Sequence, residues 1–455
     1  MFELGESTFR AQKYGSRRAF KSSKMSLCFI IFLVLPLRAL SICESPINSS
    51  RGNLKSVVAN CIADCLGLRS GNICNVNYKT VVNQVCNVNR SFEPTFQVSE
   101  QKIMFCNAAN ENINTASKLN LCTHAAFGPW FTFNSVKTDF EPMQDVIGRQ
   151  IKWKEIAQQR GVKTVLTFGS RTPEGGLNAA NWSILAASPD SRTRLTGQLI
   201  KLMDENQFDG IKVHWHYSGC PNNNCVAGNK NDKENLVLLM KALYAAVKER
   251  GKLLFLLLPN WEVYLSKGYD LVKLWSQVDY FFLETFHYNN EDGTCYLDYI
   301  APLNRIKYNL AYVRQYLADP TRMKKVLVGF TSNTVLYKLS KPNLKPKLKD
   351  SVVDFSSQKY KTMCKYVREE NFTLLLDDTN GNFAHNTTHV YAYEDYNSLK
   401  LKVEFVKSTG MAGMYFDGIV EDDVSNECKC GPMPILRIAS ELLHGGGCDV
   451  KQCLS

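Results

Sequence analysis

The sequence lacks two features that would assign it to a broad class at once: an apolar run that can span a bilayer and a dense basic run. The apolar run at residues 25–37 is about a dozen residues long, whereas a transmembrane helix needs about 20. Apart from the scattered lysines of residues 338–349, the basic residues do not cluster. We therefore expect a soluble mature chain with no membrane span and no nucleic-acid partner.

The short apolar run has the flanks of a secretory signal. Basic residues precede it, and the small residues Ala39 and Ser41 follow it at the spacing that a signal peptidase recognises. We predict that residues 1–41 are a signal peptide with a long basic N-region and that the protein is secreted. A short membrane anchor is the alternative, and Met25 is an alternative start. Removal of residues 1–41 would lower the formal charge from +11 to +6.

Zinc-type spacing is also absent from the cysteine-rich residues 42–100. Four of their five cysteines follow the pattern C-x3-C-x8-C-x11-C, with no C-x2-C pair and no histidine. We predict a small disulfide-stapled module there, with metal binding as the alternative. Of the 16 cysteines, one lies in the predicted signal. The odd remainder leaves at least one thiol free or paired between chains.

Five N-glycosylation sequons are consistent with a secretory route. Their acceptor residues are Asn48, Asn89, Asn181, Asn371 and Asn386.

From about residue 101, short apolar runs alternate with helical patterns, such as residues 233–250. Eight runs are predicted strands: 102–107, 123–133, 163–170, 210–217, 252–259, 280–288, 325–334 and 413–420. This alternation predicts a (β/α)8 TIM barrel over residues 101–455, with functional residues at the C-terminal ends of the strands. The long gap before the last run predicts a small α+β insertion at about residues 335–395.

Residues 208–217 read FDGIKVHWHY, which resembles the family 18 glycoside hydrolase signature F-D-G-I-D-I-D-W-E-Y. Lys212 and His214 stand where the family has two aspartates, and His216 stands where it has the catalytic glutamate. The resemblance extends over most of residues 102–440. It includes Cys122-Thr123-His124, residues 232–235 (DKEN) and residues 398–410 (SLKLKVEFVKSTG).

The resemblance implies a chemistry that these substitutions remove. Family 18 enzymes use the substrate's own N-acetyl group, with the glutamate as proton donor and an aspartate that orients the acetamide. Alternate residues of a strand face one way, so Lys212, His214 and His216 would share the face toward the barrel mouth. Loss of one such catalytic group costs a factor of about 10²–10⁴ in rate.

Other strand ends depart from the family pattern as well. Phe286 and His287 replace the Tyr and Asp of the family's M-T-Y-D, and Phe416 is the nearest match to the tryptophan that floors the sugar site. The motifs after the third and seventh strands are also lost. The candidate ligand-cleft residues are Trp130, Trp215, Tyr217, Glu284 and Phe416.

The replaced cluster has three interpretations. In the first, the side chains fill the barrel mouth and Glu284 neutralises Lys212, because a buried unpaired lysine is costly. In the second, His214, His216, His287 and Glu284 form a zinc or anion site, which the charge of Lys212 opposes for a cation. In the third, His216 acts as a substitute general acid. We favour the first and expect no metal and no cofactor.

Disulfides follow partly from the resemblance. Cys106–Cys122 and Cys295–Cys364 resemble pairs found in animal chitinases, whereas the spacing of Cys220 and Cys225 allows a local bridge. The pattern of the last four cysteines stays open: Cys428, Cys430, Cys448 and Cys453.

The function that we expect is that of a secreted, extracellular, non-hydrolytic chitinase-like protein. Its expected ligand is chitin or another N-acetylglucosamine-containing glycan, stacked on aromatic residues of the barrel top. The alternative is a protein-binding or signalling module with no glycan ligand. An altered but active glycosidase is the third hypothesis.

Overall fold

The computed structural model divides the chain into two units, Met1–Ser99 and Glu100–Ser455. It describes residues 101–108, 119–128, 131–134, 139–170, 179–286, 288, 296–316, 320–377, 380–445 and 454, all in the second unit. The predicted signal peptide, the cysteine-rich residues 42–100, Asn48 and Asn89 lie outside the described residues.

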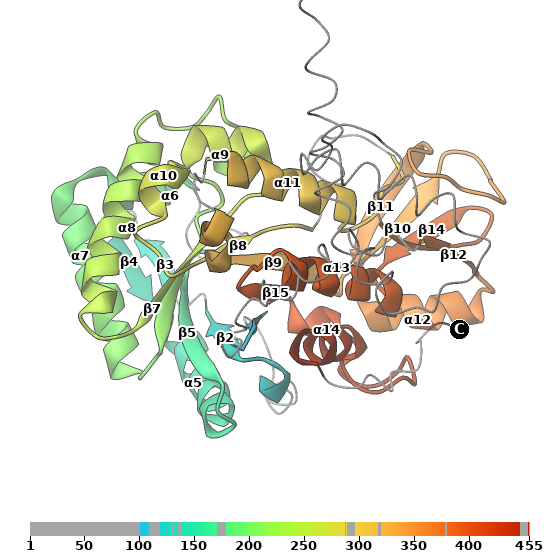
Figure 1. The fold of residues 1–455 in the computed structure, drawn as a ribbon, viewed down its shortest axis with the longest axis horizontal. Helices are drawn as coiled ribbons and strands as arrows, with labels where there is room; N and C mark the ends of the chain where they lie inside the picture. The colour runs from blue at the N-terminus through green and yellow to red at the C-terminus, as the bar shows by residue number, and fades with distance from the viewer. Residues whose placement is uncertain are drawn as a thin grey trace, which may run out of the picture. The chain divides into compact units, whose positions relative to one another are not determined.

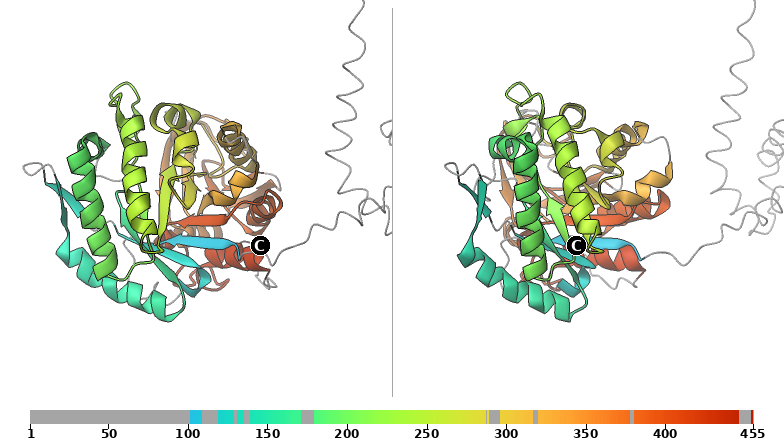
Figure 2. Two further views of the ribbon diagram at one scale, coloured as in Figure 1. Left: turned by 60° about the vertical axis from the view of Figure 1, so that its left-hand side comes forward. Right: turned by 90° about the vertical axis from the view of Figure 1, so that its left-hand side faces the viewer.

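Eight parallel strands form a closed barrel in the order β1-β15-β9-β8-β7-β6-β5-β2 (Figures 1 and 2). This confirms the predicted TIM barrel. Strands buried on both sides read as continuous apolar runs, as in the LLFLLL of β7. The strands are β1 (Ile103–Asn107), β2 (His124–Phe127), β5 (Lys163–Phe168), β6 (Gly210–Val213), β7 (Leu253–Leu258), β8 (Tyr280–Leu283), β9 (Val326–Thr331) and β15 (Gly413–Asp417).

Helices pack around the outside of this barrel (Figure 2). In α8, the residues at helical spacing that predicted the helix are buried, including Leu236, Leu239 and Leu243. In the described residues, the α-helices outside the insertion are α5 (Gln144–Gln159), α6 (Ala179–Ala187), α7 (Pro189–Glu205), α8 (Asp232–Lys248), α9 (Glu262–Gly268), α10 (Leu271–Leu274), α11 (Leu303–Gln315), α13 (Tyr396–Ser408) and α14 (Pro434–His444). Short 3-10 helices are η2 (Leu119–Leu121), η4 (Pro221–Asn223), η6 (Pro320–Lys325) and η7 (Ile419–Glu421).

One predicted strand is two separate elements. The run at residues 123–133 ends its barrel pairing at Phe127, because Gly128 has φ of +128°, a backbone conformation that favours glycine. Phe131 then starts a hairpin of β3 (Phe131–Asn134) and β4 (Asp139–Pro142).

The predicted insertion lies between β9 and α13. Its five antiparallel strands have the order β11-β10-β14-β13-β12, and one helix, α12 (Tyr360–Glu369), accompanies them. Figure 1 shows this sheet beside the barrel, in orange. The strands are β10 (Thr334–Leu339), β11 (Val352–Gln358), β12 (Thr373–Asp377), β13 (Gly381–His385) and β14 (His389–Tyr393).

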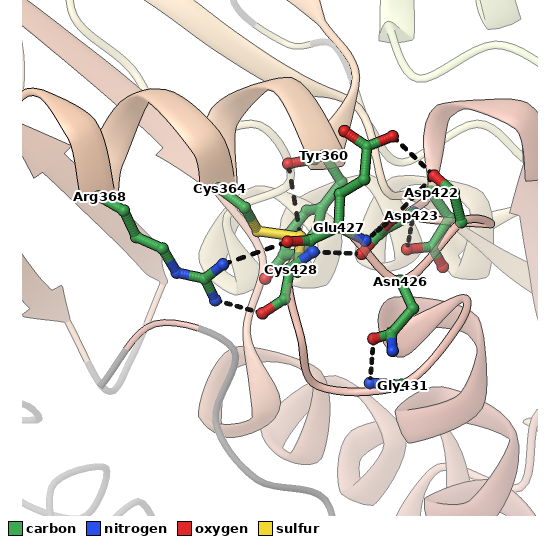
Figure 3. Close-up of a disulfide and its surroundings, with 10 residues drawn as sticks. Tyr360, Cys364, Arg368, Asp422, Asp423, Asn426, Glu427, Cys428 and Gly431 are labelled. Atoms are coloured by element: carbon green, nitrogen blue, oxygen red, sulfur yellow. Dashed lines mark hydrogen bonds between the residues drawn. A yellow bond between two sulfur atoms is a disulfide. The ribbon is translucent and has the colours of Figure 1, made fainter.

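Disulfides connect neighbouring elements. The predicted Cys106–Cys122 and Cys220–Cys225 bridges are present. The predicted Cys295–Cys364 pair is wrong, because Cys364 on the buried face of α12 bonds to Cys428 in the loop after β15 (Figure 3).

Arg368 holds the same loop by donating to the carbonyl oxygens of Glu427 and Cys428. Cys430 is also disulfide-bonded. The positions of Cys295, Cys448 and Cys453 lie outside the described residues.

Within the described ranges, none of the helices combines the length and the apolar character needed to cross a membrane.

Candidate functional site

The three substituted signature positions lie on β6 and the segment that follows it. Lys212 is completely buried, His214 is 9% exposed, and His216 is partly exposed. The backbone amide of His214 donates to the carbonyl oxygen of Phe168 at 2.9 Å, which continues the alignment with β5. The His214 and His216 ring centroids are 6.2 Å apart. The side chains at alternate positions thus lead from the barrel interior toward its mouth.

Lys212 belongs to a chain of hydrogen-bonded polar groups, which we call the lysine network: Lys212, Tyr415, Asp417 and Asn107. The Lys212 ammonium donates to the Tyr415 hydroxyl at 3.2 Å, and that hydroxyl donates to the Asp417 carboxylate at 2.7 Å. The Asn107 amide donates to the same carboxylate oxygen at 2.9 Å. The network joins β6, β15 and β1 across the barrel.

Aromatic faces supply the other surroundings of this ammonium. The Lys212 nitrogen lies 4.9 Å from the ring centroid of Tyr415 and 5.5 Å from that of Phe282. Such cation–π contacts contribute about 2 kcal/mol when the cation is desolvated. They compensate in part for the water that Lys212 loses.

Burial lowers the pKa of Lys212 from 10.5 to about 8, and the charges of Asp417 and Glu284 oppose this shift. Desolvation is the largest cause, because it disfavours the charged form. The predicted neutralising role of Glu284 is therefore met only in part, since Asp417 has the larger effect. At neutral pH the barrel interior carries an ammonium group.

Glu284, which follows β8, accepts a hydrogen bond from the Tyr217 hydroxyl at 2.7 Å. Tyr217 is fully buried and stacks on Tyr264 of α9, with ring centroids 5.2 Å apart. The phenol thus satisfies one oxygen of a buried carboxylate. Tyr217 contributes a hydrogen bond inside the barrel rather than an exposed platform.

Two of the candidate ligand-cleft residues point away from the barrel interior. Trp215 is fully buried and stacks on Trp182 of α6, with centroids 5.3 Å apart. Phe416 packs against Phe330 at 4.9 Å, on the opposite face of β15 from Tyr415. The prediction that Trp215 and Phe416 line a cleft is therefore wrong.

The remaining candidates are placed as follows. Phe286 is buried, with its ring centroid 6.4 Å from that of Tyr415, and it lies on the interior side. Trp130 and His287 lie outside the described residues. Among the residues that the structure describes, no three His, Cys, Asp or Glu side chains are grouped closely enough to hold a metal ion.

Asp417 and Tyr415 are not among the site residues predicted from the sequence. The signal that points to them is the alternation within β15: if Tyr415 faces inward, so does Asp417, and Phe416 faces outward. A one-residue error in alignment exchanges the two faces.

Three potential N-glycosylation sites lie in the described part of the chain. Asn371 is exposed in the turn after α12, whereas Asn181 and Asn386 are partly exposed. Their modification stays a prediction.

The chain is similar in sequence to known chitinases. The family model described as glycosyl hydrolases family 18 matches residues 98–417. The chain is 24% identical over 363 residues to "Probable chitinase 10" of Drosophila melanogaster, which covers 74% of this chain but only 15% of that protein. It is also 24% identical over 354 residues to "Probable chitinase 2" of the same organism, covering 68% of each.

A solved structure has the same fold. It is catalytic domain 2 of the Ostrinia furnacalis Group II chitinase, crystallised as a mutant in complex with penta-N-acetylchitooctaose. The TM-score is 0.69 at 18% identity, over 78% of this chain and 99% of that one. With the family model spanning most of the barrel, the chain belongs to glycosyl hydrolase family 18.

Proposed function

We propose that this chain is a secreted chitinase-like protein that does not hydrolyse glycosidic bonds. The observation that carries the proposal is the buried Lys212 ammonium at a position where the family has a carboxylate. The family's reaction builds positive charge on the substrate's acetamide. Two like charges about 4 Å apart repel by about 4 kcal/mol at an effective dielectric constant of 20. The ammonium would therefore raise the barrier that a carboxylate lowers.

The proton donor and the acetamide-binding groups support the same proposal. His216 stands at the position of the family's general acid, and Phe286 lacks the hydroxyl that the family's tyrosine provides. In the described part of the barrel interior, the carboxylates of Asp417 and Glu284 already accept hydrogen bonds from phenol groups. Neither lies on β6, from which the family's acid acts.

The test is turnover of a fluorogenic chitobioside by the purified mature protein, with an active family 18 chitinase as positive control. We expect no product above the blank. The single variant His216→Glu should stay inactive, because Lys212 and His214 remain. Product release by the unmodified protein that is abolished in His216→Ala would contradict the proposal and favour an altered glycosidase.

For the ligand, we propose chitin or another N-acetylglucosamine-containing glycan. Support comes from the Ostrinia furnacalis domain, which was crystallised in complex with a chito-oligosaccharide. Binding needs a fitting surface but no proton donor. Titration of N-acetylchitotetraose into the protein should give saturable heat, and its absence together with flat glycan-array signals would contradict this ligand.

A protein partner is the second candidate. The burial of Trp215 and Phe416 favours it, because two of the aromatic side chains expected to stack on sugars are unavailable. A complex isolated by crosslinking that forms equally with and without excess N-acetylchitotetraose would favour this candidate.

A further inference from the structure

The strands β10 and β11 of the insertion are joined by residues 340–351, which we call the lysine loop. Lys341, Lys345 and Lys347 are exposed in it, together with Leu344 at 74% and Leu348 at 45%. Within the described ranges, the ammonium groups of these three lysines take part in no ion pair or hydrogen bond. The proposed glycosidase-like site makes no use of this surface.

Hydrogen bonds hold the lysine loop in one conformation. The Asp350 carboxylate accepts from the Asn343 amide at 2.9 Å and from the Lys347 backbone N–H at 2.8 Å. The Asn343 side-chain oxygen accepts from the backbone N–H of Lys345 at 2.9 Å, and the Asn343 backbone N–H donates to the carbonyl oxygen of Thr387 at 2.8 Å. The loop is therefore ordered before any ligand arrives, which lowers the entropy cost of binding.

Among the described residues, two acidic groups beside the loop already have partners. Asp350 binds the loop itself, and Asp298 pairs with Arg305 at 3.1 Å and with Lys349 at 2.9 Å. The three exposed ammonium groups are left to face solvent. Their combined field attracts a ligand that carries several negative charges in a row.

An aromatic ring lies at the base of the same loop. Tyr296 is 44% exposed and pairs with Ser351 through an isolated β-bridge. Its flat apolar face suits the C–H face of a sugar ring, while its hydroxyl stays in water.

We propose that the lysine loop and Tyr296 bind a sulfated linear polysaccharide. Short lysine-rich segments of this kind bind heparin-like polyanions, and the ring adds a sugar contact. Membrane-surface segments instead present a broad apolar face, whereas two leucines are exposed here among lysines. The choice of an extracellular polyanion depends on the secretory route in the proposed function.

The test is heparin-affinity chromatography of the full mature chain from a secreting host, so that any glycan on Asn386 is present. We expect retention, with elution at clearly lower salt for the triple variant Lys341→Gln, Lys345→Gln, Lys347→Gln. The slope of log K against log salt should become shallower by about two to three, since each contact releases about one counterion. Tyr296→Ala should weaken binding without changing that slope.

The matched control is Lys241→Gln, Lys267→Gln, Lys400→Gln, three exposed lysines of α8, α9 and α13 that change the net charge equally. Its elution should match the unmodified protein. The proposal is overturned if the protein is not retained or if both triple variants shift equally. Binding to phosphatidylserine vesicles in preference to heparin, lost in Leu344→Ser, would overturn it in favour of a membrane surface.

Binding of N-acetylchitotetraose should be the same for the loop variant and the unmodified protein. A failure of the glycan ligand proposed for the barrel is thereby distinguished from a failure of the lysine loop.

Discussion

The barrel interior and the place where the insertion returns to the barrel each bury a lysine, and the two regions compensate its charge differently. After β14, Lys402 forms a direct ion pair with Glu394, with both side chains 2% exposed, and the Ser398 hydroxyl also donates to Glu394. In the barrel, the hydroxyl of Tyr415 stands between Lys212 and its anion.

The loop after β15 shows a third solution, in which backbone amides bind buried carboxylates. Asp423 accepts from the backbone N–H groups of Glu427 and Cys428 at 2.9 and 2.6 Å (Figure 3). Asp422 accepts from Leu436 at 3.0 Å, in the first turn of α14, where the helix dipole favours an anion. Glu394, Asp422 and Asp423 thus accept hydrogen bonds directly from the groups that compensate their charge. The barrel lysine instead reaches its anion through the Tyr415 hydroxyl, and it lies where the family's chemistry takes place.

The largest expected effect is on stability. Lys402→Met leaves Glu394 buried without its cation and should lower the free energy of unfolding by about 3–5 kcal/mol. Lys212→Met should cost no more than about 1–2 kcal/mol, because Asp417 keeps the hydrogen bonds from Asn107 and Tyr415. Urea denaturation followed by circular dichroism measures both. Equal costs would erase the distinction between the two regions.

Two disulfides that close loops of very different length should also differ in how much they stabilise the fold. Cys364–Cys428 closes 64 residues and ties the insertion to the barrel, whereas Cys220–Cys225 closes 5. In the loop-entropy model, replacing each pair by alanines should cost about 4 and about 2 kcal/mol. The thermal midpoints of the two double variants give the test. If loss of the shorter bridge lowers the thermal midpoint more, then native contacts rather than loop entropy determine the stability that each disulfide contributes.

Titration of Lys212 gives a smaller effect. Its pKa is about 8 in the folded state and 10.5 in the unfolded state, so between these values the unfolded state binds more protons. Stability should rise with pH there, by about 2 kcal/mol between pH 8 and 10. Lys212→Met should lack this increment. We would measure the difference between the two urea-unfolding profiles as a function of pH, and a constant difference would contradict the burial of a charged lysine.

The sequence was sufficient for the architecture, because apolar runs such as 252–259 are dictated by burial on both faces. The ends of strands were less predictable. The runs 210–217 and 280–288 extend beyond the last ladder residues, Val213 and Leu283, since the aromatic residues that follow also have strand-like character.

The site was predictable where it depends on alternation within one strand and not where it depends on register between strands. Lys212 and His214 were placed on one face from their spacing alone. The role of Asp417 required the register of β15, and the resemblance assigned Phe416 instead. Likewise, sequence spacing does not specify disulfide connectivity, so Cys428 was not recognised as the partner of Cys364.

The smallest expected effect is on the pH dependence of stability, and it distinguishes the carboxylates that accept backbone amide hydrogen bonds from the buried lysine of the barrel. Burial raises the pKa of Asp422 from 3.8 to about 7, and amide hydrogen bonds from Leu436 and Asp423 oppose the shift. The folded state therefore binds more protons than the unfolded state between these values, and stability is lost as the pH rises through 7.

Between pH 6 and 8 the loss should be about 1 kcal/mol. Asp422→Asn cannot ionise and should lack it, while its side-chain oxygen still accepts an amide hydrogen bond. Thermal unfolding of both proteins across this range tests the prediction. Parallel profiles would mean that Asp422 stays ionised when folded, and that the backbone amides compensate its charge better than Tyr415 and Asp417 compensate that of Lys212.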